Sequence, residues 1–476
     1  MDNKLLNDKK KIIRILDKTK EIAARYFMRQ DSLPAGIQVN DIALENLPHA
    51  GIGAEAALEF FEDNFADKIT NSAGSRYFGF VVGGSTPASV AGDWLVSAYD
   101  QNPFGSNNSI APQIERQAIH FLKQLFGLDD EYFGAFVTGA TMSNFTNLAV
   151  ARQWIGEQRG IDFSWEGLTD TTPVKVLSAS PHISIYKALS MLGIGKKSVV
   201  KIKMLPDREA IDVWDLERHL QQVNEPVIVV ANAGTVDTVD FDNLNVIGKL
   251  KNKYRFWMHV DAAFGGFAAC SEKYAHYLDG INYADSVTVD AHKWLNVPYD
   301  SGMQFTRHKN LQKKVFQNQA VYLGGDKAGN DILNYTPENS RRFRALPAWF
   351  TLIAYGRDGY REIIERNCEL AQKLGEKIKA SEEFLLLAPV RLNVVCFTLN
   401  RKDLSVEMIQ SFLDRIRDDG KVYFTPTVYK EIPGIRAAIS NWQTLEKDIE
   451  IAFEVLSRLI PSPQLPQEDL KAVKAF

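Results

Sequence analysis

Between residues 76 and 344 the sequence alternates short apolar runs with turns and helical segments. The runs are FGAFVTG, KVLSAS, PVIVVANAG, RFWMHVDAA and DSVTVDA, and the first two lead into TMSNFTNLAVARQWI and SIYKALSMLG. Their β-branched and aromatic content predicts strands buried on both faces. The alternation therefore favours an α/β fold in which βα units surround a mostly parallel sheet. Ligands of such sheets bind at the carboxyl ends of the strands.

Two other regions flank this one, and a chain of 476 residues is long enough for several cores. In residues 1–75, Ile12, Leu16 and Phe27 belong to an apolar series at roughly helical spacing, and GAEAALEFFEDNFADKI follows it. We expect a helical arm that packs on another surface, such as a second subunit. Residues 346–476 read as helix, strand, helix, strand and helix, which predicts a smaller α+β domain after a large domain at 76–345.

Charge and cysteine usage narrow the classes of partner. The net charge is −4, with 55 Lys and Arg against 59 Asp and Glu, so the chain lacks the basic surface of nucleic-acid or anionic-membrane binders. A small-molecule partner is therefore expected. Neither a signal peptide nor an apolar run of the ~20 residues that span a membrane is apparent, which favours the cytoplasm. Cys270, Cys368 and Cys396 lack CxxC spacing, so we expect reduced thiols and no metal site.

Two polar residues lie at the ends of predicted strands. Lys293 in DAHKW directly follows DSVTVDA, and a lysine at such a place can attack an aldehyde once its amine is neutral. Asp261 in MHVDAAFGG ends another apolar strand, where a carboxylate can ion-pair with a pyridinium nitrogen. A solvated lysine and a helix-capping aspartate are the ordinary readings of each residue alone.

Three further turns follow the same pattern. In VTGATMSNFTNL, Ala140 and Thr141 open a helix whose amino end can bind a phosphate. His182 in LSASPHISIYKA can stack on a flat ring, and Thr235 in ANAGTVDTVDFD supplies a hydroxyl. Each of these residues alone is more often a cap or a core residue. Together they occupy successive strand-end turns of one domain, which predicts one site.

The order GATMSN, SPHIS, NAGTVDTVDFD, HVDAAFGG and DAHKW resembles the group II decarboxylases that depend on pyridoxal 5′-phosphate (PLP). These enzymes have the fold type I of the aspartate-aminotransferase superfamily, and they include aromatic-amino-acid, glutamate and diaminobutyrate decarboxylases. The segments RYFGFVVGGSTPASVAGDWL, IAPQIE, ENSRRFRALPAW and IRAAISNWQT extend the resemblance to roughly residues 40–460. It implies a seven-stranded sheet, bound PLP, and decarboxylation of an L-amino acid to an amine and CO2.

The resemblance also implies roles for individual residues. Lys293 would form a Schiff base with PLP, Asp261 would pair with the ring nitrogen, and His182 would stack on the ring with Ala263 on its other face. Thr235 would approach the ring substituents. The residues implied at the phosphate are Ala140, Thr141 and His292, with Asp290 at a position where several relatives have Asn or Ser.

A tyrosine on a loop is the family's proton donor after CO2 leaves, and Tyr322 in FQNQAVYLGGDKAGNDILNY occupies its place. Tyr322 favours plain decarboxylation, because relatives with Phe there tend towards aldehyde formation. An aldehyde synthase, an aldol-type lyase, an aminotransferase and a non-catalytic binding relative remain alternatives.

The substrate side is less determined. Gln101, Asn102 and Phe104 fall where relatives recognise the substrate side chain, and Arg436 is a candidate for a carboxylate, with a structural ion pair as the alternative. Aromatic, acidic and diamino substrates all stay open. The resemblance further implies a homodimer with active sites at the subunit interface.

Overall fold

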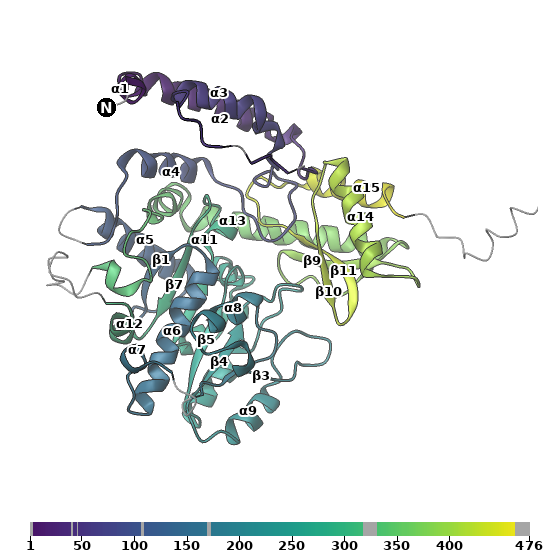
Figure 1. The fold of residues 1–476 in the computed structure, drawn as a ribbon. Helices are drawn as coiled ribbons and strands as arrows, with labels where there is room; N and C mark the ends of the chain where they lie inside the picture. The colour runs from purple at the N-terminus through teal and green to yellow at the C-terminus, as the bar shows by residue number, and fades with distance from the viewer. Residues whose placement is uncertain are drawn as a thin grey trace, which may run out of the picture.

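A computed structural model describes residues 3–39, 41–44, 46–105, 109–168, 173–317 and 331–461. Its centre is a seven-stranded sheet in the order β1-β7-β6-β5-β4-β2-β3, which is the α/β architecture predicted from the sequence (Figure 1). Neighbouring strands run parallel from β3 to β6, and β7 is antiparallel to both β6 and β1. The strands are β1 Phe133–Val137, β2 Val176–Ser178, β3 Val199–Lys201, β4 Val227–Asn232, β5 Phe256–Asp261, β6 Ser286–Val289 and β7 Gly302–Thr306.

Both faces of this sheet are buried, as the continuous apolar runs predict. Ile228 and Val230 of β4 belong to one hydrophobic cluster, and the alternate residues Val229 and Ala231 belong to another. The helices of this region are α4 Pro87–Tyr99, α5 Ala111–Phe126, α6 Ala140–Gln158, α7 Phe163–Glu166, α8 Ile183–Met191, α9 Val213–Gln221, α10 Leu244–Lys249, α11 Ala291–Trp294 and α12 Lys309–Phe316.

The strand register places the site. Asn232, the last residue of β4, pairs with Asp261, the last residue of β5, and Asp261 pairs with Thr288 of β6. The turns that follow these strands therefore start at one edge of the sheet. Thr235, Asp261 and Lys293 lie at these strand ends or directly after them, whereas Ala140 and Thr141 follow β1 and His182 follows β2.

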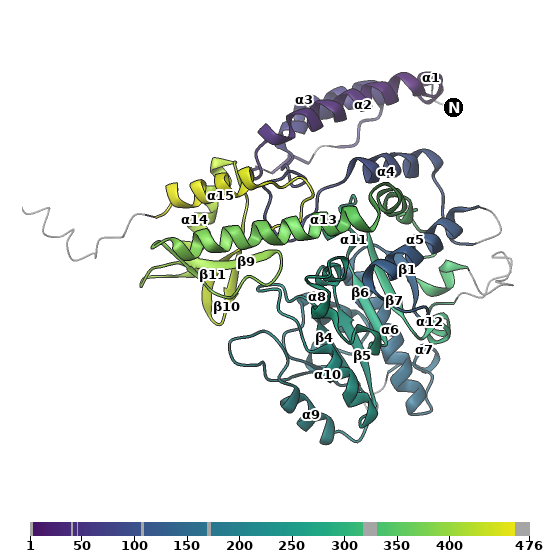
Figure 2. The ribbon, with the colours of Figure 1, turned by 180° about the vertical axis from the view of Figure 1, so that it is seen from behind.

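A second, antiparallel sheet follows the long helix α13 (Ala345–Ala380), which is kinked at Gly356. Its order is β10-β11-β9-β8, with strands β8 Phe384–Leu386, β9 Val394–Leu399, β10 Thr425–Tyr429 and β11 Ile432–Ala438. Helices α14 (Val406–Asp419) and α15 (Glu446–Arg458) belong to the same part, which lies beside the large sheet in both views (Figures 1 and 2). Strands β8 and β11 add to the helices and strands that the sequence predicts here.

The amino-terminal arm consists of α1 (Asn3–Lys10), α2 (Ile12–Arg29) and α3 (Ala54–Asn64), which project away from the two sheets (Figure 2). Ion pairs join α2 to α3, among them Arg14 to Glu55 at 2.6 Å. None of the residues in these three helices is buried. Apolar side chains such as Ile13 and Met28 are 69% and 78% exposed, so the apolar face of the arm has no covering partner within the described chain.

Candidate active site

A pocket of about 760 Å³ lies at the carboxyl edge of the large sheet. The turns after β1, β4, β5 and β6 contribute to its wall, as does the start of α8, and Arg436 of β11 reaches it from the second sheet. Ten of the residues singled out in the sequence line it: Ala140, Thr141, His182, Thr235, Asp261, Ala263, Asp290, His292, Lys293 and Arg436. Five strand-end turns that are far apart in the sequence thus surround one cavity, as the parallel-sheet argument predicts.

The remaining predicted residues lie elsewhere. Gln101, Asn102 and Phe104 follow the end of α4 and do not line this pocket. The Gln101 amide donates to the carbonyl of Tyr99, and the Asn102 side chain accepts from the Arg341 backbone N–H. Tyr322 lies outside the described residues.

The amine of Lys293 has two close neighbours. Its Nζ lies 3.4 Å from Asp290 Oδ2 and 5.6 Å from the centroid of the Phe264 ring. Lys293 belongs to α11, a single helical turn that begins directly after β6, so the end of the strand fixes where the side chain starts. The amine is therefore held in the pocket wall at a position where a bound aldehyde can meet it.

Asp290 is the most heavily used acceptor in the pocket. Its Oδ1 accepts from Ala140 N–H at the start of α6 at 3.1 Å, and its Oδ2 lies 3.2 Å from His292 Nε2. The backbone N–H of Ser301 donates to His292 Nδ1, so a neutral His292 carries its proton on Nε2 and donates to Asp290. Burial opposes ionisation of Asp290, but the charge of Lys293 and the His292 hydrogen bond outweigh it and lower the carboxyl pKa.

Asp261 is held at both carboxylate oxygens. Its Oδ1 accepts from Ala263 N–H at 3.1 Å, and its Oδ2 accepts from the Asn144 side chain at 3.0 Å. The side chain is buried yet lines the pocket, so its remaining lone pairs are available to a ligand. A fixed, desolvated carboxylate of this kind can hold a proton on a basic ring nitrogen.

His182 is the N-cap of α8. Its Nδ1 accepts from Ser184 N–H at 3.2 Å, and Ser184 Oγ lies 2.8 Å from the same atom. Burial lowers the His182 pKa, with the charge of Asp261 opposing that effect. The ring is therefore neutral near pH 7, with its proton on Nε2.

Thr235 and Arg436 complete the polar wall. The Thr235 hydroxyl donates to buried Glu209 at 2.6 Å and accepts from Asp240 N–H at 2.9 Å. Arg436 donates from Nε to the Val236 carbonyl and from Nη1 to the Phe80 carbonyl, and its buried Nη2 has no hydrogen-bond partner among the described residues. Burial lowers the Arg436 pKa to about 10, which still leaves the guanidinium charged at neutral pH.

Several lining residues were missed in the sequence, among them Phe80, Ser180, Asn232, Asp237 and Phe264. Phe80 lies in RYFGFVVGG and has a left-handed backbone (φ 56°), a conformation that no local pattern of that segment predicts. Asn232 and Ser180 end or follow predicted strands, so the strand-end rule could have found both of them.

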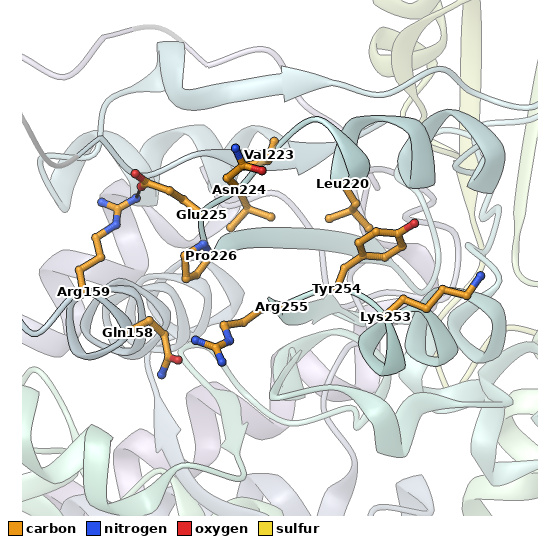
Figure 3. A pocket seen from close by; sticks show the side chains of 11 residues that line it. Gln158, Arg159, Leu220, Val223, Asn224, Glu225, Pro226, Lys253, Tyr254 and Arg255 are labelled. Carbon is orange, nitrogen blue, oxygen red and sulfur yellow. Dashed lines mark hydrogen bonds and ion pairs between the residues drawn. The ribbon is translucent and has the colours of Figure 1, made fainter.

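A second hollow of about 440 Å³ lies at the opposite, amino edge of the sheet, before β4 and β5 (Figure 3). Its Arg159 guanidinium lies beside the Glu225 carboxylate, and Pro226 and Arg255 form part of the wall. None of the residues predicted from the sequence lines it. The side chains predicted to take part in chemistry therefore line the carboxyl-edge pocket and not this one.

The three cysteines are free and buried, and burial raises the Cys270 pKa to about 12. In the described ranges no group of three or more His, Cys, Asp or Glu side chains is arranged to hold a metal ion. The helices described here also include none that is long and apolar enough to cross a membrane.

A family model described as the pyridoxal-dependent decarboxylase conserved domain matches residues 45–400, and the chain belongs to this family. An aromatic-L-amino-acid decarboxylase of Bacillus atrophaeus is 29% identical over 86% of each chain. An L-2,4-diaminobutyrate decarboxylase of Acinetobacter baumannii is 31% identical over 68% of this chain and 66% of its own. A 4-hydroxyphenylacetaldehyde synthase of Rhodiola rosea is 24% identical over 88% of this chain and 87% of its own.

The crystal structure of Oryza sativa TDC with PLP and tryptamine has the same fold. It superposes with a TM-score of 0.87 over 95% of this chain and 98% of its own, at 20% identity. This protein is accordingly a PLP-dependent decarboxylase of fold type I.

The pocket fits PLP by the chemistry of its side chains. An amine for the aldehyde (Lys293), a carboxylate for the ring nitrogen (Asp261) and a flat neutral imidazole (His182) line one cavity. At the amino end of α6 the backbone N–H of Thr141 faces a phosphate position, whereas the N–H of Ala140 donates to Asp290. Ala263 has only a methyl group, which leaves room for a ring.

Proposed function

We propose that this chain decarboxylates an L-amino acid to the corresponding amine and CO2 in the pocket around Lys293. The observation that carries the proposal is that an amine, a carboxylate and an arginine with a free Nη2 line one cavity. When bound, PLP supplies an aldehyde that condenses with amines and a ring that accepts the electrons of a breaking Cα bond. All other tasks fall to the residues of the chain.

Lys293 would hold the cofactor through the reaction of its Nζ with the aldehyde. Asp261 holds the proton at the ring nitrogen, where its fixed carboxylate stabilises positive charge. The imidazole of His182 would support one face of the ring. These three residues hold the cofactor in place before the substrate arrives.

Arg436 determines which bond breaks. Its free Nη2 can hold the substrate carboxylate, and this contact fixes the direction of the Cα–carboxylate bond relative to the ring. Once CO2 leaves, a proton must be added at Cα. We assign this transfer to Tyr322, which lies outside the described residues, because the family places its tyrosine there.

We further propose a homodimer. The exposed apolar face of the arm needs a covering surface, and a second copy supplies one of matching character. From the resemblance we also propose that Gln101, Asn102 and Phe104, which follow α4, take part in recognition of the substrate side chain. The cytoplasmic location stays a prediction of the sequence.

The test supplies aromatic, acidic and diamino L-amino acids with a labelled carboxyl carbon to the PLP-loaded protein. Labelled CO2 and amine in equal amounts are expected from at least one of them. Aldehyde in place of amine would favour the chemistry of the Rhodiola rosea relative, and keto acid would favour transamination. For Tyr322→Phe we expect continued release of CO2 with the product diverted from amine to aldehyde, whereas an unchanged amine yield would remove Tyr322 from the proposal.

A further inference from the structure

A hydrogen-bond chain beneath the pocket connects two of its walls. Asn144, on the second turn of α6, donates from Nδ2 to Asp261 Oδ2 at 3.0 Å and to Ser184 Oγ at 3.1 Å. Its Oδ1 lies 2.9 Å from Nε2 of His259 on β5. Asn144, His259 and Ser184 are all buried, and none of the three was singled out in the sequence. One amide therefore touches both Asp261 and the serine that contacts His182.

The direction of every bond in this chain follows from one fixed donor and one fixed acceptor. The indole N–H of Trp257 can only donate, and it donates to Ser286 Oγ at 2.9 Å. The fixed acceptor is the Asp261 carboxylate, which takes Nδ2 of Asn144 and so turns the Asn144 carbonyl towards His259 Nε2, which must donate. Nδ1 of His259 then accepts, and the O–H of Ser286, 2.8 Å away, donates to it. The proton of His259 is then on Nε2, and it is donated to the carbonyl oxygen of Asn144. Burial lowers the His259 pKa to about 4, so the ring stays neutral in this arrangement.

The reverse orientation of the Asn144 amide is disfavoured. It would place the carbonyl oxygen against the Asp261 carboxylate, which as an ionised group can only accept hydrogen bonds. It would also place an N–H₂ group against the Nε2–H of His259. The amide therefore has a single satisfied orientation, and the His259 donor holds it there.

Ser184 extends this hydrogen-bond direction to His182. Because Ser184 Oγ accepts from Asn144, its own O–H is free to donate to His182 Nδ1, where Ser184 N–H also donates. The His182 proton is thereby restricted to Nε2. The buried amide of Asn144 thus fixes the Asp261 carboxylate, and through Ser184 it supports the tautomer of His182.

We propose that Asn144 is a positioning residue for the PLP site, which aims Asp261 at the ring nitrogen and supports the His182 tautomer, and that His259 fixes the orientation of its amide. This inference rests on the proposed roles of Asp261 and His182. It adds two residues that touch neither substrate nor cofactor.

The test compares Asn144→Ala with Asn147→Ala. Both asparagines are fully buried on α6, but Asn147 donates to the Val287 carbonyl and Thr288 Oγ1 and touches neither Asp261 nor Ser184. Asn144→Ala is expected to raise the dissociation constant of PLP and lower kcat, each roughly 10-fold or more, since a hydrogen bond to a charged group is lost. KM should change little. The absorbance of the bound cofactor should change with pH at a shifted midpoint, which a purely structural role would not move.

A second pair of variants keeps the proposal testable if Asn144→Ala does not fold. His259→Gln retains an N–H₂ donor near the Asn144 carbonyl and should keep the wild-type midpoint. His259→Phe removes that donor at similar shape and should shift the midpoint in the same direction as Asn144→Ala. Equal effects of Gln and Phe, or equal effects of Asn144→Ala and Asn147→Ala, would overturn the inference.

Asp261→Asn separates the failure of this inference from a failure of the proposed site. If Asp261→Asn shifts the absorbance midpoint and Asn144→Ala leaves it in place, only the positioning role of Asn144 is wrong. If Asp261→Asn also leaves it in place, Asp261 does not meet the ring nitrogen, and the inference falls with that assignment.

Discussion

The carboxylate of Asp290 lies 3.4 Å from the Lys293 amine and also accepts from the first N–H of α6. It thereby takes up the donor that the phosphate of PLP would otherwise use. Its pKa is lowered, so the group is negative across the working pH range. A phosphate bound at this end of α6 would therefore meet the negative charge of Asp290, which contacts both Lys293 and His292.

Asp290→Asn is expected to tighten PLP binding about 5-fold, equal to about 1 kcal/mol, because an amide oxygen still accepts from Ala140 N–H without the negative charge. Equilibrium dialysis or an absorbance titration with PLP measures this change. A weaker affinity in the variant would show that alignment of Lys293 and His292 outweighs the repulsion.

Lys293→Ala should abolish the covalent link to the cofactor. Borohydride reduction followed by mass spectrometry should find the PLP mass on Lys293 in the wild-type chain and nowhere in the variant. Turnover should fall to background. A variant that keeps a reducible linkage would refute the assignment of this lysine.

Arg436→Met should raise KM for the amino acid roughly 10- to 100-fold, because a charge-assisted hydrogen bond to the carboxylate is lost. Arg436→Lys should recover only part of this loss, since an ammonium group cannot reproduce the geometry of the guanidinium. The amine product has no carboxylate, so its inhibition constant should stay near the wild-type value. A parallel rise in that constant would point to a general disturbance of the pocket.

Arg341→Ala should lower the free energy of unfolding by about 3–5 kcal/mol, because it leaves the Glu115 charge buried without its partner. The guanidinium makes contacts of 2.8 and 3.0 Å with the two Glu115 oxygens, and both side chains are almost fully buried. Arg342→Ala is the control. Its ion pair with Asp93 is partly exposed, and its loss should change stability by less than about 1 kcal/mol in denaturant unfolding.

His259 should make stability depend on pH. Burial lowers its pKa from 6.5 to about 4, so between these pH values the unfolded chain binds a proton at His259 and the folded chain does not. The contribution of this group is full above about pH 6.5 and is lost as the pH falls towards 4, a decrease of about 3 kcal/mol. Denaturant unfolding at pH 7 and pH 4.5 measures it, and His259→Gln should show a smaller drop between those two pH values than the wild type.

The strand-end residues could be predicted because their placement follows from the backbone alone. Apolar runs of strand length mark where β5 and β6 end, and the parallel register brings those ends to one edge. The backbone alone therefore brings Asp261 and Lys293 to the same pocket, independently of their side-chain contacts. Asn144 could not be predicted in this way, because its importance depends on which partners meet its amide across α6, α8 and β5.

Strand β11 was missed for a physical reason. It is joined to β10 by Lys430 and Glu431, which both have left-handed backbones at φ 49° and 65°. A turn of this kind usually carries Asn-Gly or Asp-Gly, so two charged residues give no hairpin signal. Arg436 lies on the missed strand, and its position in the pocket could be inferred only from the resemblance.

The helical arm has no core of its own, and isolated helices of this length are marginal in water. The arm is therefore ordered only when another surface covers its apolar face. In a dimer that surface belongs to a second molecule. Dilution should unfold the arm before it affects the central sheet. The midpoint of unfolding of the arm should depend on protein concentration, whereas the melting of a sheet that needs no second molecule should not.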